Sequence, residues 1–317
     1  MTPELQKKVD AAIKLLQVAA GDDVVEVAYS GGKDSDVILE LARMSGIKFR
    51  AIYKNTTIDP PGTIKHAKDN GVEILNPKKN FITILAENGF PTRTSRFCCR
   101  YLKEYKVLDK VVMGVRKAES TKRAKRYSEP TECRFYGNKK DHVEAIYPIL
   151  DWSDQDVVDF IVARGIKVHS LYYREDGTID PKRRLGCMCC PLASIGKRRE
   201  QFKKYPNMIK VYIRAGQKYR ETHPNVNRVK DHKDIYMWFA REVFYDSQIL
   251  WEQSHKDLLF EVETDYKKFI EDYFNIQLPD YSQSTPNPDT VSDHQPDSVS
   301  DHQPDSVSAS QPNSDIR

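Results

Sequence analysis

A strand that runs directly into a glycine-rich turn is the feature that most limits what this chain can fold into. Residues 24–29, VVEVAY, indicate a buried strand, and residues 30–35, SGGKDS, lead from it into an apolar helix predicted over 35–44. Gly31 and Gly32 let the backbone turn sharply and come close to a ligand. The freed N–H groups and the start of the helix then face an anion. The sequence therefore predicts a phosphate-binding loop at the end of a strand.

The side chains of this loop suit the same ligand. Lys33 adds a mobile positive charge, Ser30 and Ser35 add hydroxyl groups, and Asp34 lies between them. The spacing differs from the Walker A loop, which has more residues before its Gly-Lys pair, and from the dinucleotide fingerprint, which needs a third glycine. We therefore expect a nucleotide-binding loop of another class.

Strand and helix signals alternate through the first half of the chain. Further strands are predicted over 49–53, 72–75 and 110–115, and helices over 63–70, 99–108 and 153–163, after a first helix that begins at Thr2. This alternation predicts an α/β fold with a doubly wound, mostly parallel sheet. From 197 to about 274 the pattern is helical and rich in aromatic residues. We expect an adenine-nucleotide-binding α/β domain over 1–194 and a basic helical extension over 195–279.

The end of the chain is an octad repeat. Residues 288–295 recur as 296–303 and, less closely, as 304–311, and the repeat is rich in Pro, Ser, Asp and Gln without any aromatic residue. Such a segment cannot bury enough apolar surface to offset the entropy of its chain. The sequence therefore predicts a disordered tail over 280–317.

Composition limits the classes of protein that remain. Hydrophobic residues make up 39% of the 317 residues, which allows a packed core, and no run is long and apolar enough to span a membrane. No secretory signal is visible at the start, so a cytoplasmic location is expected.

Basic residues are concentrated in two parts of the sequence. Residues 182–230 contain 14 Lys or Arg and two acids, and residues 116–126 contain six Lys or Arg and one acid. These concentrations favour an anionic partner such as a nucleotide or a nucleic acid, with a solvated basic face as the alternative.

The cysteines are few and clustered, which favours metal or redox chemistry over structural disulfides. Cys98 and Cys99 are adjacent, and Cys187 and Cys190 have the C-x-x-C spacing that lets two sulfurs reach one centre. On spacing alone, four such thiolates could hold a [4Fe–4S] cluster or a tetrahedral Zn²⁺. Cys189 is an extra thiol that could replace a neighbour as ligand, and the isolated Cys133 is interpreted as a small apolar residue.

These motifs together resemble a known family. S-G-G-x-D-S after a strand resembles the PP-loop, or adenine nucleotide α-hydrolase-like, superfamily, and a vicinal Cys-Cys upstream of Gly-Cys-x-x-Cys resembles the phosphoadenosine phosphosulfate (PAPS) and adenosine phosphosulfate (APS) reductase family. The resemblance implies an adenine nucleotide, ATP or PAPS/APS, at residues 30–35, with Mg²⁺ as an open option. It also implies a [4Fe–4S] cluster on Cys98, Cys99, Cys187 and Cys190, with zinc as the alternative.

Residues 114–123 follow the family pattern G-x-R-x-x-[E/Q]-S-x-x-R after a strand. The resemblance implies that Arg116 and Ser120 help to bind the nucleotide and that Arg116 and Arg123 are bidentate partners of phosphate or sulfate oxygens. Lys33, Arg116 and Arg123 are then the candidate catalytic residues, which would stabilise charge on the transferred group.

One departure from the family bears on the reaction. True sulfonucleotide reductases carry a catalytic cysteine near the C-terminus, and this chain has no cysteine after Cys190. Two reactions therefore compete: reduction of an adenylyl sulfate, with Cys133 or Cys189 as a substitute nucleophile, and ATP pyrophosphatase chemistry that adenylates an acceptor for sulfur transfer, as in DNA phosphorothioation. In the second case the basic region 182–230 could contact a nucleic acid. The alternatives are a non-catalytic nucleotide- or nucleic-acid-binding redox sensor, and a zinc-stabilised scaffold with a degenerate loop. The oligomeric state cannot be predicted from these features.

Overall fold

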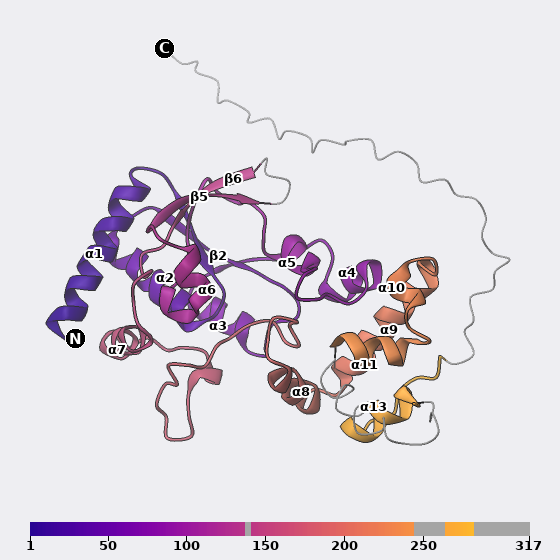
Figure 1. The fold of residues 1–317 in the computed structure, drawn as a ribbon. Coiled ribbons are helices and arrows are strands. Elements are labelled where there is room, and N and C mark those ends of the chain that lie inside the picture. Colours follow the sequence, from indigo (N-terminus) through magenta and orange to yellow (C-terminus); the bar gives the residue numbers. More distant parts are fainter. Residues whose placement is uncertain (137–140, 244–263, 282–317) are drawn as a thin grey trace, which may run out of the picture. The chain divides into compact units, whose positions relative to one another are not determined.

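The computed structural model describes residues 1–136, 141–243 and 264–281. Within them, six strands form one sheet in the order β3-β2-β1-β4-β6-β5. The strands are β1 (Val25–Tyr29), β2 (Phe49–Lys54), β3 (Glu73–Leu75), β4 (Lys110–Val112), β5 (Thr131–Tyr136) and β6 (Asp141–Ile146). All neighbouring pairs are parallel except β5 and β6, which are antiparallel. The predicted doubly wound, mostly parallel α/β sheet is confirmed (Figure 1).

Three helices supply the main hydrophobic core on one face of the sheet: α1 (Pro3–Ala20), α2 (Lys33–Ser45) and α7 (Asp154–Arg164). Alternate residues of β1, namely Val25, Val27 and Tyr29, point into this core, as the period of a strand requires. The Thr2 hydroxyl caps α1 by accepting a hydrogen bond from the Leu5 N–H. The alternation in β1 and the cap of α1, both of which were visible in the sequence, are therefore present in the structure.

Two predicted elements are shorter than expected. The helix predicted over 99–108 is α5 (Phe97–Leu102), and the strand predicted over 110–115 is β4, which ends at Val112. The remaining helices of this part are α3 (Thr63–Asp69), α4 (Phe81–Asn88) and α6 (Thr121–Arg126), and short 3-10 turns cover Lys117–Glu119 and Ser170–Tyr172. The hairpin of β5 and β6 adds the antiparallel edge that the alternation did not predict.

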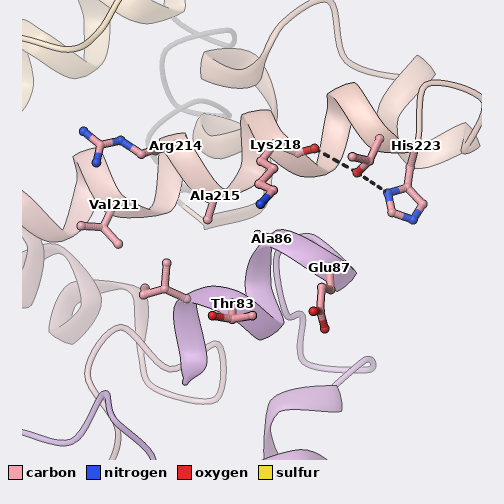
Figure 2. Close-up of a pocket in the computed structure, with 10 residues that line it drawn as sticks. Thr83, Ala86, Glu87, Val211, Arg214, Ala215, Lys218 and His223 are labelled. Atoms are coloured by element: carbon pink, nitrogen blue, oxygen red, sulfur yellow. Dashed lines mark hydrogen bonds between the residues drawn. The ribbon is translucent and has the colours of Figure 1, made fainter. Parts of the chain in front are cut away.

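A second core joins α4 and α5 to the helices that follow the sheet. These are α8 (Ile195–Lys204), α9 (Asn207–Thr222), α10 (Asn227–Lys230), α11 (Ile235–Val243) and α13 (Tyr266–Phe274). Phe90 packs against Tyr212 of α9 and Trp238 of α11, with ring centroids 6.1 and 4.6 Å away. A groove of about 610 Å³ runs between α4 and α9 (Figure 2). None of the predicted site residues lines this groove.

The described residues all belong to one compact unit, Met1–Gln283. The domain boundary predicted at 194 stays a prediction. The tail predicted over 280–317 falls outside the described residues from 282 onward. In the described ranges, no helix combines the length and the apolar character needed to cross a membrane.

Candidate functional site

The loop that follows β1 has the geometry for which its glycines are needed. Gly31 has φ +75°, in the left-handed region, and a Cβ atom added to it would lie 2.8 Å from the Thr63 Cγ2 atom. Gly32 is the N-cap of α2, so the loop leads directly into the start of that helix. Both backbone conformation and packing therefore exclude a larger residue at position 31.

The serines of the loop are bound to its backbone and to each other. The Ser35 hydroxyl donates to the Gly32 carbonyl oxygen at 2.7 Å, and the Ser30 hydroxyl donates to the Ser35 hydroxyl oxygen at 3.3 Å. The Gly32 N–H points back to the Ser30 hydroxyl oxygen at 3.4 Å. These contacts hold the N–H groups of the turn together at the end of β1.

A pocket of about 180 Å³ opens beside this loop. It lies at the carboxyl ends of β1 and β4, where the strand order reverses, the usual ligand position in open α/β sheets. Three parts of the chain line it: the end of β1 with its loop, the segment after β4, and the segment that leads to α8. The lining residues are Ala28, Ser30, Gly32, Asp34, Ser35, Gly114, Glu119, Arg123, Tyr172, Arg184 and Leu185. Four of the predicted loop residues and Arg123 are thus brought to one pocket.

Gly114 brings the segment after β4 into direct contact with the start of α2. A Cβ atom at this position would lie 2.9 Å from the Asp34 carbonyl oxygen and 3.0 Å from its carbonyl carbon. Because both neighbours are backbone atoms, no side-chain rotation could make room for it. The close approach of the two backbones, which forms the pocket, therefore depends on a glycine at 114.

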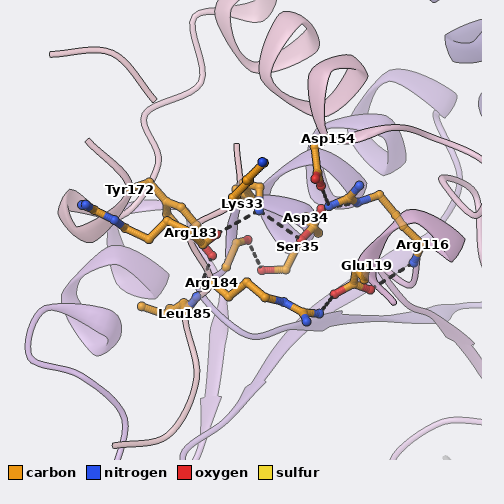
Figure 3. Close-up of polar contacts among 12 residues, drawn as sticks. Lys33, Asp34, Ser35, Arg116, Glu119, Asp154, Tyr172, Arg183, Arg184 and Leu185 are labelled. Atoms are coloured by element: carbon orange, nitrogen blue, oxygen red, sulfur yellow. Dashed lines mark hydrogen bonds and ion pairs between the residues drawn. The ribbon is translucent and has the colours of Figure 1, made fainter. Parts of the chain in front are cut away.

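A carboxylate joins the two arginines of the pocket. Glu119 accepts hydrogen bonds from Arg123 and from Arg184, and one of its oxygens also accepts from the Arg116 N–H at 3.2 Å. Figure 3 shows the contacts of Glu119 with Arg184 and Arg116. Burial, followed by the nearby Arg184, lowers the pKa of Arg123. Sequence reasoning did not single out Arg184, although it belongs to the basic region 182–230.

Lys33 lies behind the pocket lining. Its side chain is 2% exposed, and its Nζ atom donates to the Arg183 carbonyl oxygen at 3.1 Å and lies 5.2 Å from the Tyr172 ring centre. Burial lowers its pKa. The Leu185 N–H in turn donates to the Tyr172 hydroxyl oxygen at 3.1 Å. Lys33 and Tyr172 therefore fasten the loop before α8 to the nucleotide loop, and the predicted catalytic role of Lys33 stays a prediction.

Arg116 is buried and fully engaged with protein groups. Its Nε atom is 2.6 Å from Asp34 Oδ1, its Nη2 atom is 2.8 Å from Asp154 Oδ1, and its Nη1 atom donates to the Trp152 carbonyl oxygen at 3.3 Å. The side chain is 1% exposed. The predicted contact of Arg116 with phosphate stays a prediction. Ser120 is the N-cap of α6 and accepts from the Arg123 N–H at 3.2 Å, outside the pocket lining.

The four predicted metal-ligating thiols line one cavity. Cys98 and Cys99 come from α5, and Cys187 and Cys190 come from the loop before α8. The cavity has a volume of about 30 Å³, and its other walls are mainly apolar, including Ile58, Phe81, Leu102 and Tyr212. A set of four cysteine sulfurs in apolar surroundings fits an iron–sulfur or zinc centre in its chemistry.

The thiols are not arranged as a ready-made metal site. Over residues 1–136, 141–243 and 264–281, no three His, Cys, Asp or Glu side chains are grouped closely enough to hold an ion. A hydrogen bond with Cys98 lowers the pKa of Cys99 to about 6, and burial raises the pKa of Cys187 to about 11. The [4Fe–4S] cluster and its zinc alternative both stay predictions.

The other two cysteines point away from both sites. Cys189 has φ +54°, is 3% exposed and packs in the second core, while its N–H donates to Gln201 Oε1 at 2.8 Å. This left-handed turn separates its sulfur from the cavity that its neighbours line. Cys133 is exposed on β5, unlike the apolar residue that its isolation suggested.

Solved structures of an adenylyltransferase are among those similar to this chain. Three structures of FMN adenylyltransferase from Candida glabrata match: one with no ligand named (13% identity, TM-score 0.36), one with FMN and the ATP analogue AMPCPP (13%, 0.37) and one with ATP (12%, 0.36). They cover 53%, 56% and 53% of this chain, and the chain covers 58%, 62% and 58% of theirs. The chain thus spans less than two thirds of their length. No curated protein shows significant sequence similarity to it.

A family comparison covers the sheet, the nucleotide loop and both cysteine pairs. Residues 25–193 match the model of the phosphoadenosine phosphosulfate reductase domain. The match begins at the first residue of β1 and ends shortly after Cys190. Because it extends over more than half of the sequence, the chain belongs to the phosphoadenosine phosphosulfate reductase domain family.

Proposed function

We propose that this protein is an enzyme of sulfur metabolism that binds the phosphates of an adenine nucleotide in the pocket between β1 and β4. Membership of the family supports a nucleotide-binding PP-loop enzyme. The observation that carries the proposal is the pocket itself, in which the Ser30 and Ser35 hydroxyls face Arg123 and Arg184 at the point where the strand order reverses. Hydroxyls, backbone N–H groups and guanidinium groups are the donors that phosphate oxygens require.

Of the two reactions that the sequence leaves open, we favour ATP pyrophosphatase chemistry. No cysteine lines the phosphate pocket, and the two thiols considered as nucleophiles for reduction lie elsewhere, Cys133 on β5 and Cys189 in the second core. An acceptor oxygen attacks the α-phosphorus, the bond from that phosphorus to the bridging oxygen breaks, and pyrophosphate leaves with the bond electrons. Arg123 and Arg184 stabilise the charge on the leaving group.

As the acceptor we propose a nucleic acid, in line with the basic region 182–230.

Reduction of an adenylyl sulfate is the second candidate. The match to the phosphoadenosine phosphosulfate reductase domain and the thiol cavity favour it. In this reaction a thiol of the chain, with Cys133 and Cys189 as the candidates, attacks the sulfonyl sulfur, and an added dithiol supplies the two electrons that release sulfite.

One assay separates these reactions. The purified protein is incubated with ATP, Mg²⁺ and single-stranded DNA, and separately with PAPS and a dithiol, and pyrophosphate and sulfite are measured. Pyrophosphate from ATP is the expected result, in amounts that increase with the DNA. Sulfite from PAPS would assign reduction instead. Nucleotide binding without either product would contradict both reactions and support a non-catalytic sensor.

We also propose that Cys98, Cys99, Cys187 and Cys190 hold a thiolate-ligated centre, a [4Fe–4S] cluster with zinc as the alternative. Their shared cavity supports this proposal. Such a centre supplies electron transfer if it contains iron and sulfide, and structural cross-linking of α5 to the loop before α8 if it is zinc.

Replacing Cys187 by serine is expected to remove most of the bound metal, because one of four thiolate ligands is lost. Iron, zinc and acid-labile sulfide are measured in the purified variant. Cys189→Ser is the matched control: it changes the same functional group two residues away, in a side chain that packs in the second core, and should retain the metal. Equal metal content in both variants would refute the ligand assignment.

A further inference from the structure

A basic cavity lies next to the nucleotide pocket. It has a volume of about 750 Å³ and is formed by α8, the loop before it and Leu171. It shares Arg184 with the phosphate pocket and Met188 with the thiol cavity. A ligand in this cavity would therefore lie beside both candidate sites.

The cavity is strongly cationic. Five basic side chains line it against the single carboxylate of Glu200; they are Lys182, Arg183, Arg184, Lys197 and Lys204. The two arginines have protein partners, since Arg183 donates to the Leu171 and Tyr173 carbonyl oxygens and Arg184 is bound to Glu119. The Lys197 Nζ atom also donates to a backbone carbonyl oxygen, that of Arg184, at 2.9 Å, but none of the three lysines makes an ion pair with a carboxylate of the described residues. Their charge is thus available to an anion.

The sequence of α8 explains why the charge gathers on one face. Lys197, Glu200, Gln201 and Lys204 are spaced three or four residues apart, so they share one side of the helix and face the cavity. Arg198 and Phe202 occupy the opposite side and are buried. The Ser194 hydroxyl caps the helix by accepting from the Lys197 N–H at 3.3 Å. The lysine face is therefore fixed by a packed and capped helix.

The cavity also offers apolar surfaces. Tyr205 and Met188 line it, and Leu171 is 39% exposed at its edge. The ring of Tyr205 lies 5.7 Å from the Lys204 Nζ atom. A cationic groove combined with aromatic and apolar side chains is typical of proteins that bind single-stranded nucleic acid, because the phosphates meet the cations while unstacked bases meet the flat surfaces.

We infer that this cavity binds the backbone of a single-stranded nucleic acid, with phosphates against Lys182, Lys197 and Lys204 and a base against Tyr205. The inference rests on the proposed function and specifies its acceptor. A strand seated here passes Arg184, which also lines the phosphate pocket, so an oxygen of its backbone comes next to the nucleotide. A rigid duplex is too wide to enter such a cavity with its bases, which favours the single-stranded form.

Gly196 allows a test that changes charge without changing shape. It lies in the first turn of α8 and lines the cavity, and an added Cβ atom would meet nothing within 4 Å. Gly196→Glu adds a carboxylate, and Gly196→Gln adds a side chain of nearly the same size without charge. Binding of a fluorescein-labelled oligonucleotide of about ten nucleotides is measured by anisotropy with the full-length protein. We expect about tenfold weaker binding for Gly196→Glu than for Gly196→Gln.

A second pair of substitutions counts the phosphate contacts. In the double variant Lys182→Gln and Lys204→Gln, the slope of log affinity against log salt concentration should become flatter by about 1.4, because each contact with a single strand contributes about 0.7. Both side chains are exposed, so the fold should not depend on them. An unchanged slope, or equal binding by the two Gly196 variants, would overturn the inference.

Two further measurements keep this inference apart from the proposed function. ATP binding and PAPS binding are measured on the same variants. Loss of oligonucleotide binding with ATP binding intact supports a separate strand site, whether or not the enzyme turns over ATP. If Gly196→Glu weakens PAPS binding but not oligonucleotide binding, the cavity serves the nucleotide's own phosphate and the inference is wrong. Tighter binding of a duplex than of a single strand would also overturn it.

Discussion

Replacing Arg116 by methionine is expected to lower the free energy of unfolding by about 3 kcal/mol. The guanidinium is 1% exposed and contacts two carboxylates, Asp34 at 2.6 Å and Asp154 at 2.8 Å. Methionine fills part of the volume but leaves these carboxylates and the Trp152 carbonyl oxygen without their donor. Because Asp34 and Asp154 are 19% and 39% exposed, water would partly replace the lost contacts, which places the expected cost at the lower end for a buried pair.

Urea unfolding of Arg116→Met and Arg116→Lys measures this effect. Lysine keeps the charge but not the planar fork, so it can serve one carboxylate well and should show an intermediate loss of stability. ATP binding is measured alongside. If Arg116→Met kept its stability and lost ATP binding, the side chain would contact the nucleotide, as the family pattern implies. Loss of stability in both variants would instead assign it to holding Asp34 and Asp154 in place.

The elements that the sequence predicted well are those with complete local signals. The strand before the nucleotide loop and the helix after it lie within a few residues of their predicted limits, as β1 and α2. The helix α7 begins one residue after the predicted start at 153, and the Ser153 hydroxyl caps it by accepting from the Asp156 N–H. In each case the apolar period and the capping residue are adjacent in the chain, so no distant contact is needed to recognise them.

The hairpin of β5 and β6 shows why other elements were missed. In β5 the exposed Phe135 alternates with the ionic Glu132 and Arg134, so the apolar residues do not mark the buried face. Pairing with β6, rather than its own pattern, makes this segment a strand. The antiparallel edge of the sheet was therefore not visible in the alternation of strands and helices.

The loop of the candidate site is easier to recognise in the sequence than its polar partners are. The glycines and serines of residues 30–35 can be recognised as a nucleotide-binding loop from their residue types and spacing alone. The arginines do not, because the role of each depends on carboxylates that the fold brings near. Arg116 meets Asp154, 38 residues later, and Arg184 meets Glu119, 65 residues earlier. The sequence could therefore indicate basic residues for the phosphates but not which of them remain beside the pocket.

Replacing Gly114 by alanine is expected to destabilise the protein by about 2 kcal/mol and to weaken ATP binding about tenfold. The new methyl group would lie 2.9 Å from the Asp34 carbonyl oxygen, so the segment after β4 or the start of α2 has to move. Either movement displaces residues that line the phosphate pocket, because Gly114, Asp34 and Ser35 all belong to it. Thermal unfolding and isothermal titration with ATP measure the two effects.

Gly186→Ala provides the matched control for this change. It is also a glycine beside a motif residue, but its φ is not in the left-handed region and an added Cβ atom would meet nothing within 4 Å. Its stability should therefore stay within about 0.5 kcal/mol of the unsubstituted protein. If Gly114→Ala bound ATP as well as Gly186→Ala does, the contact between the two backbones would not shape the nucleotide site. The phosphates would then have to bind outside the pocket at the ends of β1 and β4.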